Sequence, residues 1–262
     1  MESVNLKKIL ICLLLVLAAV ISFFPIGNLA ASADSHTADM AKLDEKIETV
    51  LKLSASATAV SVGVTMLPDD TATPIAEELA DFTGYFLGIL TILYAEKYLL
   101  TILGFGAFKI VIPLAAGICI AGICAQSGGM QKLSYKLVLF ALAVYFAIPL
   151  GIKVSDDVYT SYETSLNTTI ESAQQISDES DEVSNTQSGI ASVIGNLSEA
   201  ASNLLSRATA IINQYVEGIA ILIVTSCVIP VLVLFLMLYL AKMLLGVDVT
   251  VFRIPNFPGR HH

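Results

Sequence analysis

The sequence predicts an all-α integral membrane protein: a helical membrane bundle with an extracytoplasmic helical hairpin that resembles a coiled coil. Three runs without a charged residue, 110–125, 137–152 and 218–241, indicate membrane helices, because about 20 apolar residues cross a hydrocarbon core of about 30 Å. Only 14% of the chain is charged and 55% is hydrophobic, whereas about a quarter of a soluble domain is charged. A seven-residue apolar repeat in an acidic segment indicates the hairpin.

We expect seven segments along the chain. They are a signal peptide or signal anchor (1–33), an extracytoplasmic acidic helical segment (34–81), a re-entrant, interfacial or transmembrane helix (82–109), a transmembrane helix pair (110–152), an acidic heptad-patterned helical hairpin (153–217), a transmembrane helix (218–245) and a basic tail (246–262).

The N-terminus has the three parts of an export signal. Lys7 and Lys8 precede an apolar run over residues 9–24, and Ala31-Ser32-Ala33 offers a small-x-small cleavage site. We expect cleavage after Ala33, with an uncleaved anchor as the alternative. Both outcomes place residue 34 outside the cytoplasm.

The first acidic segment is predicted to be helical in two places. Residues 35–55 carry apolar side chains at helical spacing, and a second short helix is expected from Thr73-Pro74 to Asp81. Between them, residues 57–67 are small and β-branched, which allows a strand or an extended stretch. Both helices have to bury their apolar stripes against a partner.

The segment 82–109 is apolar but carries Glu96 and Lys97 near its middle. The two are candidate intramembrane charges, since charges in a membrane are costly and often functional. They are also consistent with an interface, where such side chains extend into the headgroups, and this is the interpretation that we favour. The same segment has a stripe of small residues that permits close helix packing, at Gly84, Gly88, Thr91 and Ala95.

Two topologies follow from this segment. If it crosses the membrane, residues 153–217 are cytoplasmic; if it does not, both acidic segments lie outside. The positive-inside rule favours the second arrangement, because it places Lys132, Lys136 and Lys242 in the cytoplasm. We therefore expect a multi-pass protein of the bacterial cytoplasmic (inner) membrane whose acidic segments are extracytoplasmic.

The acidic segment 153–217 carries an unbroken heptad repeat. We expect a helical hairpin with its break near residues 178–189, where Ser, Asp and Glu gather. The seam is a packing stripe or, alternatively, a coiled coil for partner binding or self-association. Its residues are Ile176, Val183, Ile190, Leu197, Leu204 and Ile211.

The chain lacks the residue patterns of common catalytic and metal sites. Its histidines are His36 and the terminal pair His261-His262, which leaves no Ser/His/Asp arrangement and no histidine-based metal site. No phosphate-binding glycine loop is present. The net charge of −9 argues against nucleic acid. We expect no enzyme activity, no catalytic residue, no cofactor and no bound metal.

One stretch resembles a group of bacterial inner-membrane proteins with no assigned activity. Val62-Gly63-Val64-Thr65, Thr73-Pro74-Ile75, Asp81-Phe82 and Glu96-Lys97-Tyr98-Leu99-Leu100 are similar to a "GVxxT…LDPxNDLxERFS…LGxQxxLL" pattern. Tyr145-Phe146-Ala147-Ile148-Pro149 stands where that group has "RFAxP", with Tyr for Arg. Lys97 stands near the expected Gln, and Ala80-Asp81 replaces a Glu-Arg pair. The resemblance covers about 100 residues and implies an architecture and a compartment only.

The expected function is that of a structural, scaffold or partner-binding component of the bacterial envelope. Its partners would be the lipid bilayer and either a protein or a second copy bound through the heptad region. The alternative is a small transporter or channel subunit that uses the helix with Glu96 and Lys97, with a kink at Pro230.

Overall fold

The computed structural model describes residues 2–66, 72–186 and 194–245, and within these ranges it contains helices and no strand. The α-helices are α1 (Glu2–Ile21), α2 (Gly27–Ala30), α3 (Thr37–Thr65), α4 (Ala72–Phe105), α5 (Ile112–Cys124), α6 (Gly128–Thr186), α7 (Ile194–Ile223) and α8 (Ile229–Leu245). Four short helices of other types join them: η1 (Ser22–Ile26), η2 (Ala33–His36), η3 (Gly106–Val111) and η4 (Val224–Val228).

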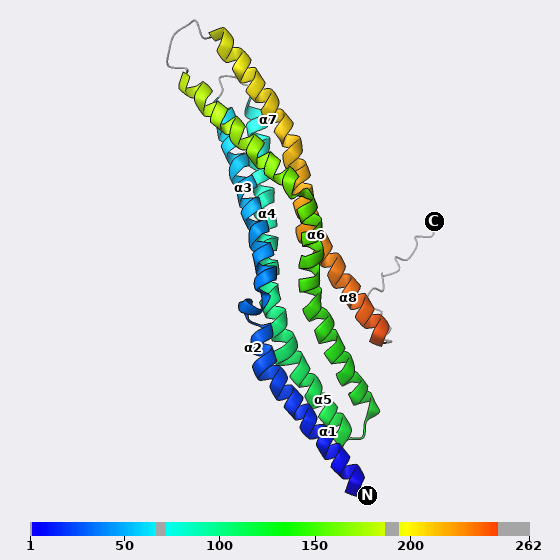
Figure 1. Ribbon diagram of the computed structural model, residues 1–262. Coiled ribbons are helices and arrows are strands. Elements are labelled where there is room, and N and C mark those ends of the chain that lie inside the picture. The colour runs from blue at the N-terminus through cyan, green and yellow to red at the C-terminus, as the bar shows by residue number, and fades with distance from the viewer. Residues whose placement is uncertain (1, 67–71, 187–193, 246–262) are drawn as a thin grey trace, which may run out of the picture.

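The helices form an elongated rod in which neighbouring helices run along the long axis (Figure 1). Five stretches are long and apolar enough to cross a membrane: Lys8–Ala30, Asp34–Thr65, Ala72–Cys124, Gly128–Ser180 and Ser202–Met243. This confirms the all-helical fold class and the presence of membrane-length apolar helices. Several of these stretches are much longer than the about 20 residues that a membrane requires.

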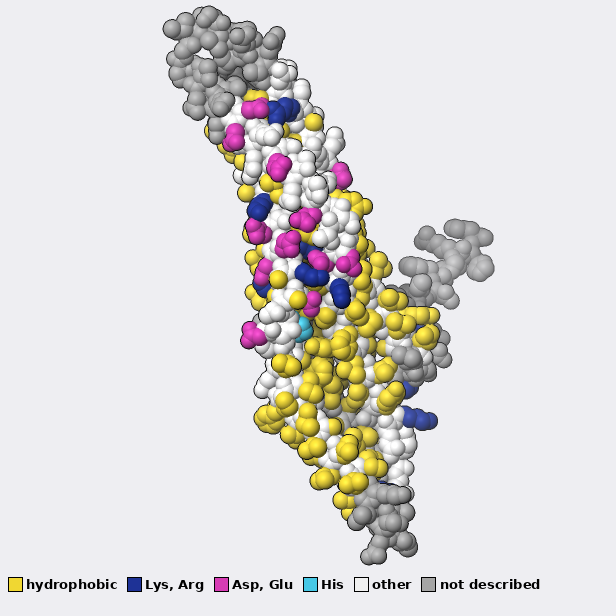
Figure 2. Space-filling view, in the orientation of Figure 1, with side chains coloured by type: hydrophobic (Ala, Val, Ile, Leu, Met, Phe, Trp, Pro, Cys, Tyr) yellow, Lys and Arg dark blue, Asp and Glu magenta, His cyan; other side chains and the backbone are white. Residues whose placement is uncertain are grey.

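The rod divides into two halves of different surface chemistry (Figure 2). We call one the apolar half; it consists of α1 to α2, η3 to α5, residues 128–152 of α6, and η4 to α8. Residues 8–30, 106–124, 128–152 and 224–245 contain no Asp or Glu, and large hydrophobic side chains such as Leu14, Leu114 and Phe235 are more than half exposed. At about 1.5 Å per residue, each of these four ranges forms a helical path about 28 to 38 Å long.

The polar half is a four-helix bundle made of α3, α4, residues 153–186 of α6, and α7. Its surface carries charged side chains of both signs (Figure 2), while its axis is filled by Leu53, Val60, Leu79, Phe86 and Tyr215, all essentially buried. The edge-to-face contact of Phe86 with Tyr215, with ring centroids 6.1 Å apart, joins α4 to α7. Each of the two acidic segments thus buries its apolar stripe against the other.

In three of the four paths a helix runs from one half into the other without a loop, whereas the chain leaves the helix at Ala31-Ser32 between α2 and α3. Residues 57–65 are the last turns of α3, so the predicted strand is wrong; the apolar residues of this stretch, among them Val60 and Val64, fall on the buried face of a helix. The short helix predicted for residues 73–81 and the segment 82–109 belong to one continuous path from Ala72 to Cys124. Helix α6 runs on through Ile152, because its charged residues beyond that point can point outward without breaking the helix.

The predicted break near residues 178–189 lies partly outside the described residues. Helix α6 continues to Thr186, past the Ser-, Asp- and Glu-rich run, and α7 begins at Ile194. The two helices are antiparallel, and Arg207 of α7 pairs with Glu179 of α6. The hairpin geometry agrees with the sequence pattern.

Three π-helical segments occur where prolines interrupt the regular hydrogen bonding of the apolar half. Pro25 lies inside η1, Pro113 follows η3 by two residues, and Pro230 follows η4 by two residues. Proline lacks an N–H and its ring crowds the preceding turn. A wider turn relieves this crowding. At Pro230, where we predicted a kink, the structure has a π-helical turn before the proline.

The N-terminal helix packs along η3 and α5. The Ser22 hydroxyl donates to the Phe108 carbonyl at 2.9 Å. Gly104 approaches Ala30 so closely that a Cβ on Gly104 would lie 1.9 Å from the Ala30 carbonyl oxygen. His36 is buried and its Nε2 lies 3.3 Å from the same oxygen. These contacts make the segment before residue 34 part of the bundle.

Candidate functional site

The strongest cluster of buried polar groups lies where the polar half meets the apolar half. Each of the four helical paths contributes one member: Lys46 from α3, Glu96 from α4, Ser155 from α6 and Ser226 from η4. All four side chains are more than nine-tenths buried. We call this set the polar layer. Buried Lys and Glu side chains are rare in folded proteins, so two of them in one core need an explanation.

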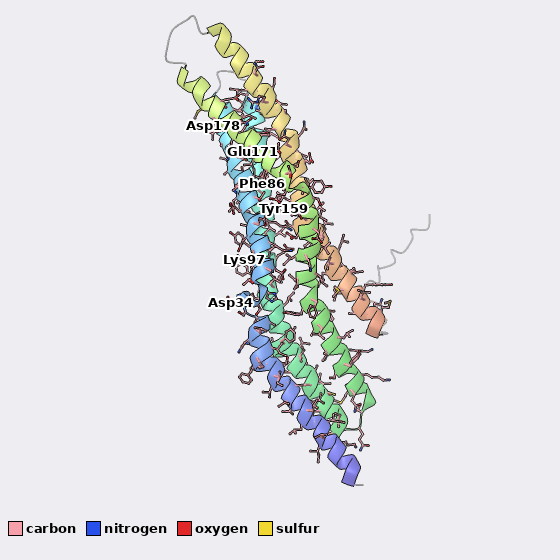
Figure 3. All side chains as sticks on the ribbon, in the orientation of Figure 1. Asp34, Phe86, Lys97, Tyr159, Glu171 and Asp178 are labelled. Carbon is pink, nitrogen blue, oxygen red and sulfur yellow. The ribbon has the colours of Figure 1, made fainter. Side chains whose placement is uncertain are left out.

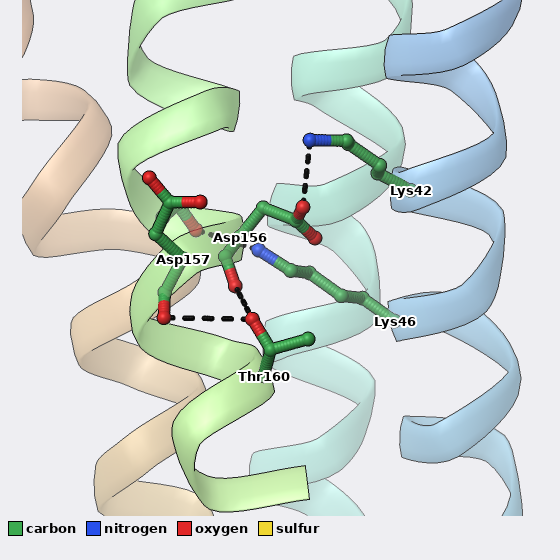
Figure 4. Close-up of polar contacts among 6 residues, drawn as sticks. Lys42, Lys46, Asp156, Asp157 and Thr160 are labelled. Carbon is green, nitrogen blue, oxygen red and sulfur yellow. Dashed lines mark hydrogen bonds and ion pairs between the residues drawn. The ribbon is translucent and has the colours of Figure 1, made fainter.

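Lys46 extends from α3 towards α6 (Figure 4) and is only 1% exposed. Its ammonium donates a hydrogen bond to the Ser155 hydroxyl at 2.7 Å and lies 5.1 Å from the centre of the Tyr159 ring. The Tyr159 hydroxyl in turn donates to the Thr49 hydroxyl at 2.8 Å. A buried ammonium needs such partners because it has left water.

Ser155 links Lys46 to the π-helical turn of the C-terminal path. The Ser155 hydroxyl donates to the backbone carbonyl of Thr225. The irregular turn η4 places this carbonyl where a side chain of α6 can reach it. Serine is therefore required here as both acceptor and donor.

Glu96 is 7% exposed and faces the same core. Its carboxylate makes no ion pair within 4.0 Å of a basic group in the described chain. Lys46 nevertheless acts on it through space as an opposite charge. The layer therefore holds one positive and one negative group that attract each other without direct contact.

Two ion pairs flank the polar layer on the outside. Lys42 pairs with Asp156 at 2.6 Å (Figure 4), and Lys97 pairs with Asp44. Lys97 lies near the lower end of the polar half, below Phe86 and Tyr159 (Figure 3). Although Glu96 and Lys97 are adjacent in sequence, they lie in different surroundings. Glu96 faces the core, whereas Lys97 pairs with Asp44 and is not part of the buried cluster.

Burial shifts both titratable members of the polar layer, which lie in the polar half outside the apolar segments. Desolvation lowers the pKa of Lys46 to about 8, although Asp156 and Glu96 oppose the shift. Desolvation raises the pKa of Glu96 to about 7, and attraction to Lys46 opposes it. Each group is moved towards its neutral form because the core solvates charge poorly. Such shifts are typical of functional sites but also occur in structural charge networks.

Sequence reasoning identified Glu96 and missed Lys46. A signal was present, because Lys46 lies three residues after Leu43 and four before Val50, which are both on the buried stripe of α3. A lysine in the middle of an apolar stripe indicates either a snorkelling side chain or an internal partner. Ser155 and Ser226 carry no sequence signal of this kind.

The predicted helix-packing stripe lies on the outward face of α4. Gly84, Gly88, Thr91 and Ala95 are exposed, and a Cβ on either glycine would meet no atom within 4 Å. Tyr85, Tyr94 and Tyr98 stand beside the stripe and are also exposed. No helix of the described chain packs there.

The heptad seam, in contrast, points inward wherever the structure describes its side chains. Ile176, Leu204 and Ile211 are at most 3% exposed and belong to the core of the polar half. The side chains of Val183, Ile190 and Leu197 lie outside the described residues. The described part of the seam packs within the chain.

Among the described residues, no group of three or more His, Cys, Asp or Glu side chains is arranged to hold a metal ion. No protein family, curated protein or solved structure matches the chain. The resemblance to the group of inner-membrane proteins therefore stays an expectation.

Proposed function

We propose that this chain is a scaffold or partner-binding component of the bacterial inner membrane. In this proposal four helical paths, namely α1 to α2, η3 to α5, the first part of α6, and η4 to α8, cross the bilayer. The polar half then projects from the extracytoplasmic face. The observation that carries the proposal is the change of surface along the helical paths, with exposed apolar side chains and no Asp or Glu over residues 8–30, 106–124, 128–152 and 224–245.

The charge distribution supports the orientation. Lys8, Lys132, Lys136 and Lys242 each lie near the end of their helix that points away from the polar half. Basic residues in short loops and at helix ends stay in the cytoplasm. The helix Asp34–Thr65 does not count as a span in this proposal, because its apolar side chains face the bundle core and its other faces carry charges.

We place partner binding on the outward face of α4 rather than on the heptad seam. The seam residues that the structure describes are already buried. The face of Gly84, Gly88, Thr91 and Ala95 is open, and small residues allow a second helix to approach closely. Exposed tyrosines beside it supply large rigid contact area, as in many interfaces. A second copy of the chain is the partner that the test below addresses.

Reporter fusions test the topology. A periplasm-active phosphatase fused after Met66 should be active, and a cytoplasm-active fluorescent protein fused after Leu245 should fluoresce. The reciprocal fusions, fluorescent protein after Met66 and phosphatase after Leu245, should be silent. An active phosphatase after Leu245 would contradict the proposed orientation.

Disulfide cross-linking in native membranes tests the interface. In a background with Cys12, Cys119, Cys124 and Cys227 replaced by Ala, Thr91→Cys should give a covalent dimer on mild oxidation. Ser161→Cys, an exposed position on α6, is the matched control and should stay monomeric. Equal cross-linking of both variants, or none of either, would exclude self-association through α4.

The transporter alternative stays a prediction. It uses the helix that carries Glu96 and Lys97 as a moving part; in the structure Glu96 is buried and Lys97 pairs with Asp44.

A further inference from the structure

Two buried polar atoms of the polar layer have no hydrogen-bond partner among the described residues: Glu96 Oε1 and Ser226 Oγ. The exposed fractions of these residues are 7% and 1%. A buried polar atom without a partner costs about 1–3 kcal/mol, and more if it is charged. Each such atom in a native core indicates a partner that is not a protein side chain.

The helix register places Glu96 and Ser226 at the same level. Helices α4 and α7 run in the same direction, and Tyr215 packs on both Phe82 and Phe86. Ser226 follows Tyr215 by eleven residues, which is three helical turns on the same face. Glu96 follows Phe86 by ten residues, so it descends the bundle by almost the same distance.

Lys46 lies at this level as well. Ser56 of α3 contacts the Tyr215 hydroxyl at 2.8 Å. Because α3 is antiparallel to α7, the residue of α3 at the level of Ser226 lies before Ser56 in the sequence, and Lys46 precedes Ser56 by ten residues. The ammonium has three donors. One of them goes to Ser155, and among the described residues Lys46 and Glu96 form no ion pair within 4.0 Å. Lys46 therefore has donors left for a further acceptor.

We propose that the polar layer binds an ordered water molecule that bridges Lys46, Glu96 and Ser226. The water accepts a hydrogen bond from the Lys46 ammonium and donates one to Glu96 Oε1 and one to Ser226 Oγ. Three hydrogen bonds to buried polar groups are what internal waters typically make. The arrangement satisfies both orphan atoms and converts the attraction between Lys46 and Glu96 into a water-bridged ion pair.

The charges in the layer favour water over an ion. Lys46 and Glu96 already neutralise each other, so an added cation or anion would leave a net charge in a poorly solvating core. A proton on Glu96 would remove one of the two acids, Asp156 and Glu96, whose negative charges act most strongly on Lys46. A neutral ligand with both donors and acceptors avoids both outcomes.

The test is a high-resolution structure of the full-length protein in lipid nanodiscs at about pH 7.5, between the pKa values of Glu96 and Lys46, for the wild type and two variants. The wild type should show a density peak at hydrogen-bond distance from Glu96 Oε1, Ser226 Oγ and the Lys46 ammonium, about 2.7–3.2 Å. Ser226→Val, which fills the space and removes the hydroxyl, should lose the peak. Thr225→Val is the matched control, because the Thr225 hydroxyl bonds the carbonyl of Ile221 in its own helix, and this variant should keep the peak.

Infrared spectroscopy supplies a second readout that does not depend on density. The difference between the wild type and Glu96→Gln at the same pH should show loss of a carboxylate band. Loss of a carboxylic acid C=O band instead would mean that Glu96 holds a proton, and the proposal would be wrong. A wild-type structure in which Glu96 contacts the Lys46 ammonium directly, with no bridging density, would overturn it too.

Discussion

Lys46 and Lys97 have the same side chain and lie at the same level of the polar half, yet they should contribute very differently to stability. Lys46 is 1% exposed and shares the core with Glu96, whereas the side chain of Lys97 is partly exposed and pairs with the half-exposed Asp44. Removing one member of a buried charge pair leaves the other without compensation, while a surface pair contributes little.

We therefore expect Lys46→Met to destabilise the protein by about 3–5 kcal/mol. Lys97→Met should cost about 1 kcal/mol or less. The measurement is thermal unfolding of detergent-solubilised protein followed by circular dichroism. The double variant Lys46→Met/Glu96→Leu should recover most of the loss. Equal effects of the two single variants would show that Lys46 is solvated in the native state.

The pKa of Glu96 also predicts how stability depends on pH. Its folded-state pKa is about 7, above its ordinary value of 4.5, so the folded state binds the proton more tightly. The stability from this group is fully present below about pH 4.5 and is lost as the pH rises through 7. The unfolding temperature of the wild type minus that of Glu96→Gln should fall as the pH rises from 4.5 to 7. The fall should be equivalent to about 3 kcal/mol of unfolding free energy. A flat difference would show that Glu96 titrates normally.

At the residue scale, only one of the four members of the polar layer, Glu96, could be predicted from the sequence. Glu96 stood out because a charge in an apolar run is conspicuous. Lys46 was inconspicuous because α3 carries many charged residues. Only its position on the same helical face as the apolar residues distinguishes Lys46, which faces inward, from the charged residues that face water. Ser155 and Ser226 depend on which helices become neighbours, and that is a property of the tertiary fold.

At the scale of elements, one very close backbone approach joins the segment before residue 34 to α4. A Cβ on Gly104 would lie 1.9 Å from the Ala30 oxygen, whereas a Cβ on Gly117 of α5 would meet nothing within 4 Å. The first glycine is required for packing and the second is not.

Gly104→Ala should therefore destabilise the protein by about 1–3 kcal/mol, because backbone has to move away from backbone. Gly117→Ala should be neutral or stabilise the helix by up to about 1 kcal/mol, since alanine is the better helix former. Thermal unfolding in detergent compares the two variants. A neutral Gly104→Ala would show that the helix before residue 34 does not pack on α4.

Element types could be predicted from the sequence much better than element ends. Apolar runs and heptad spacing identified helices, but the boundaries were drawn where the charge changed. In the structure α4 and α6 pass through those changes, because the backbone hydrogen bonds of a helix do not depend on whether its side chains face lipid or water. The residues 57–65 were ambiguous for another reason: small and β-branched residues suit a strand locally, and packing against α4 decided for the helix.

At the scale of the whole molecule, the two acidic segments, separated by more than seventy residues in the chain, form one bundle. The sequence indicated that the helices of the first segment have to bury their apolar stripes against a partner. It could not show the order of the helices around the axis. That order places Lys46, Glu96, Ser155 and Ser226 in one layer.

The uninterrupted helices have a mechanical consequence. The path from Ala72 to Cys124 spans 53 residues, about 80 Å as a helix, and α6 is of similar length, so each is one continuous helical path, with η3 in the first and Pro149 in the second, that carries the polar layer part of the way along it. A sideways force on the far tip of the polar half is then a torque on the same helices in the apolar half. Whatever pulls on one end of this molecule tilts the other.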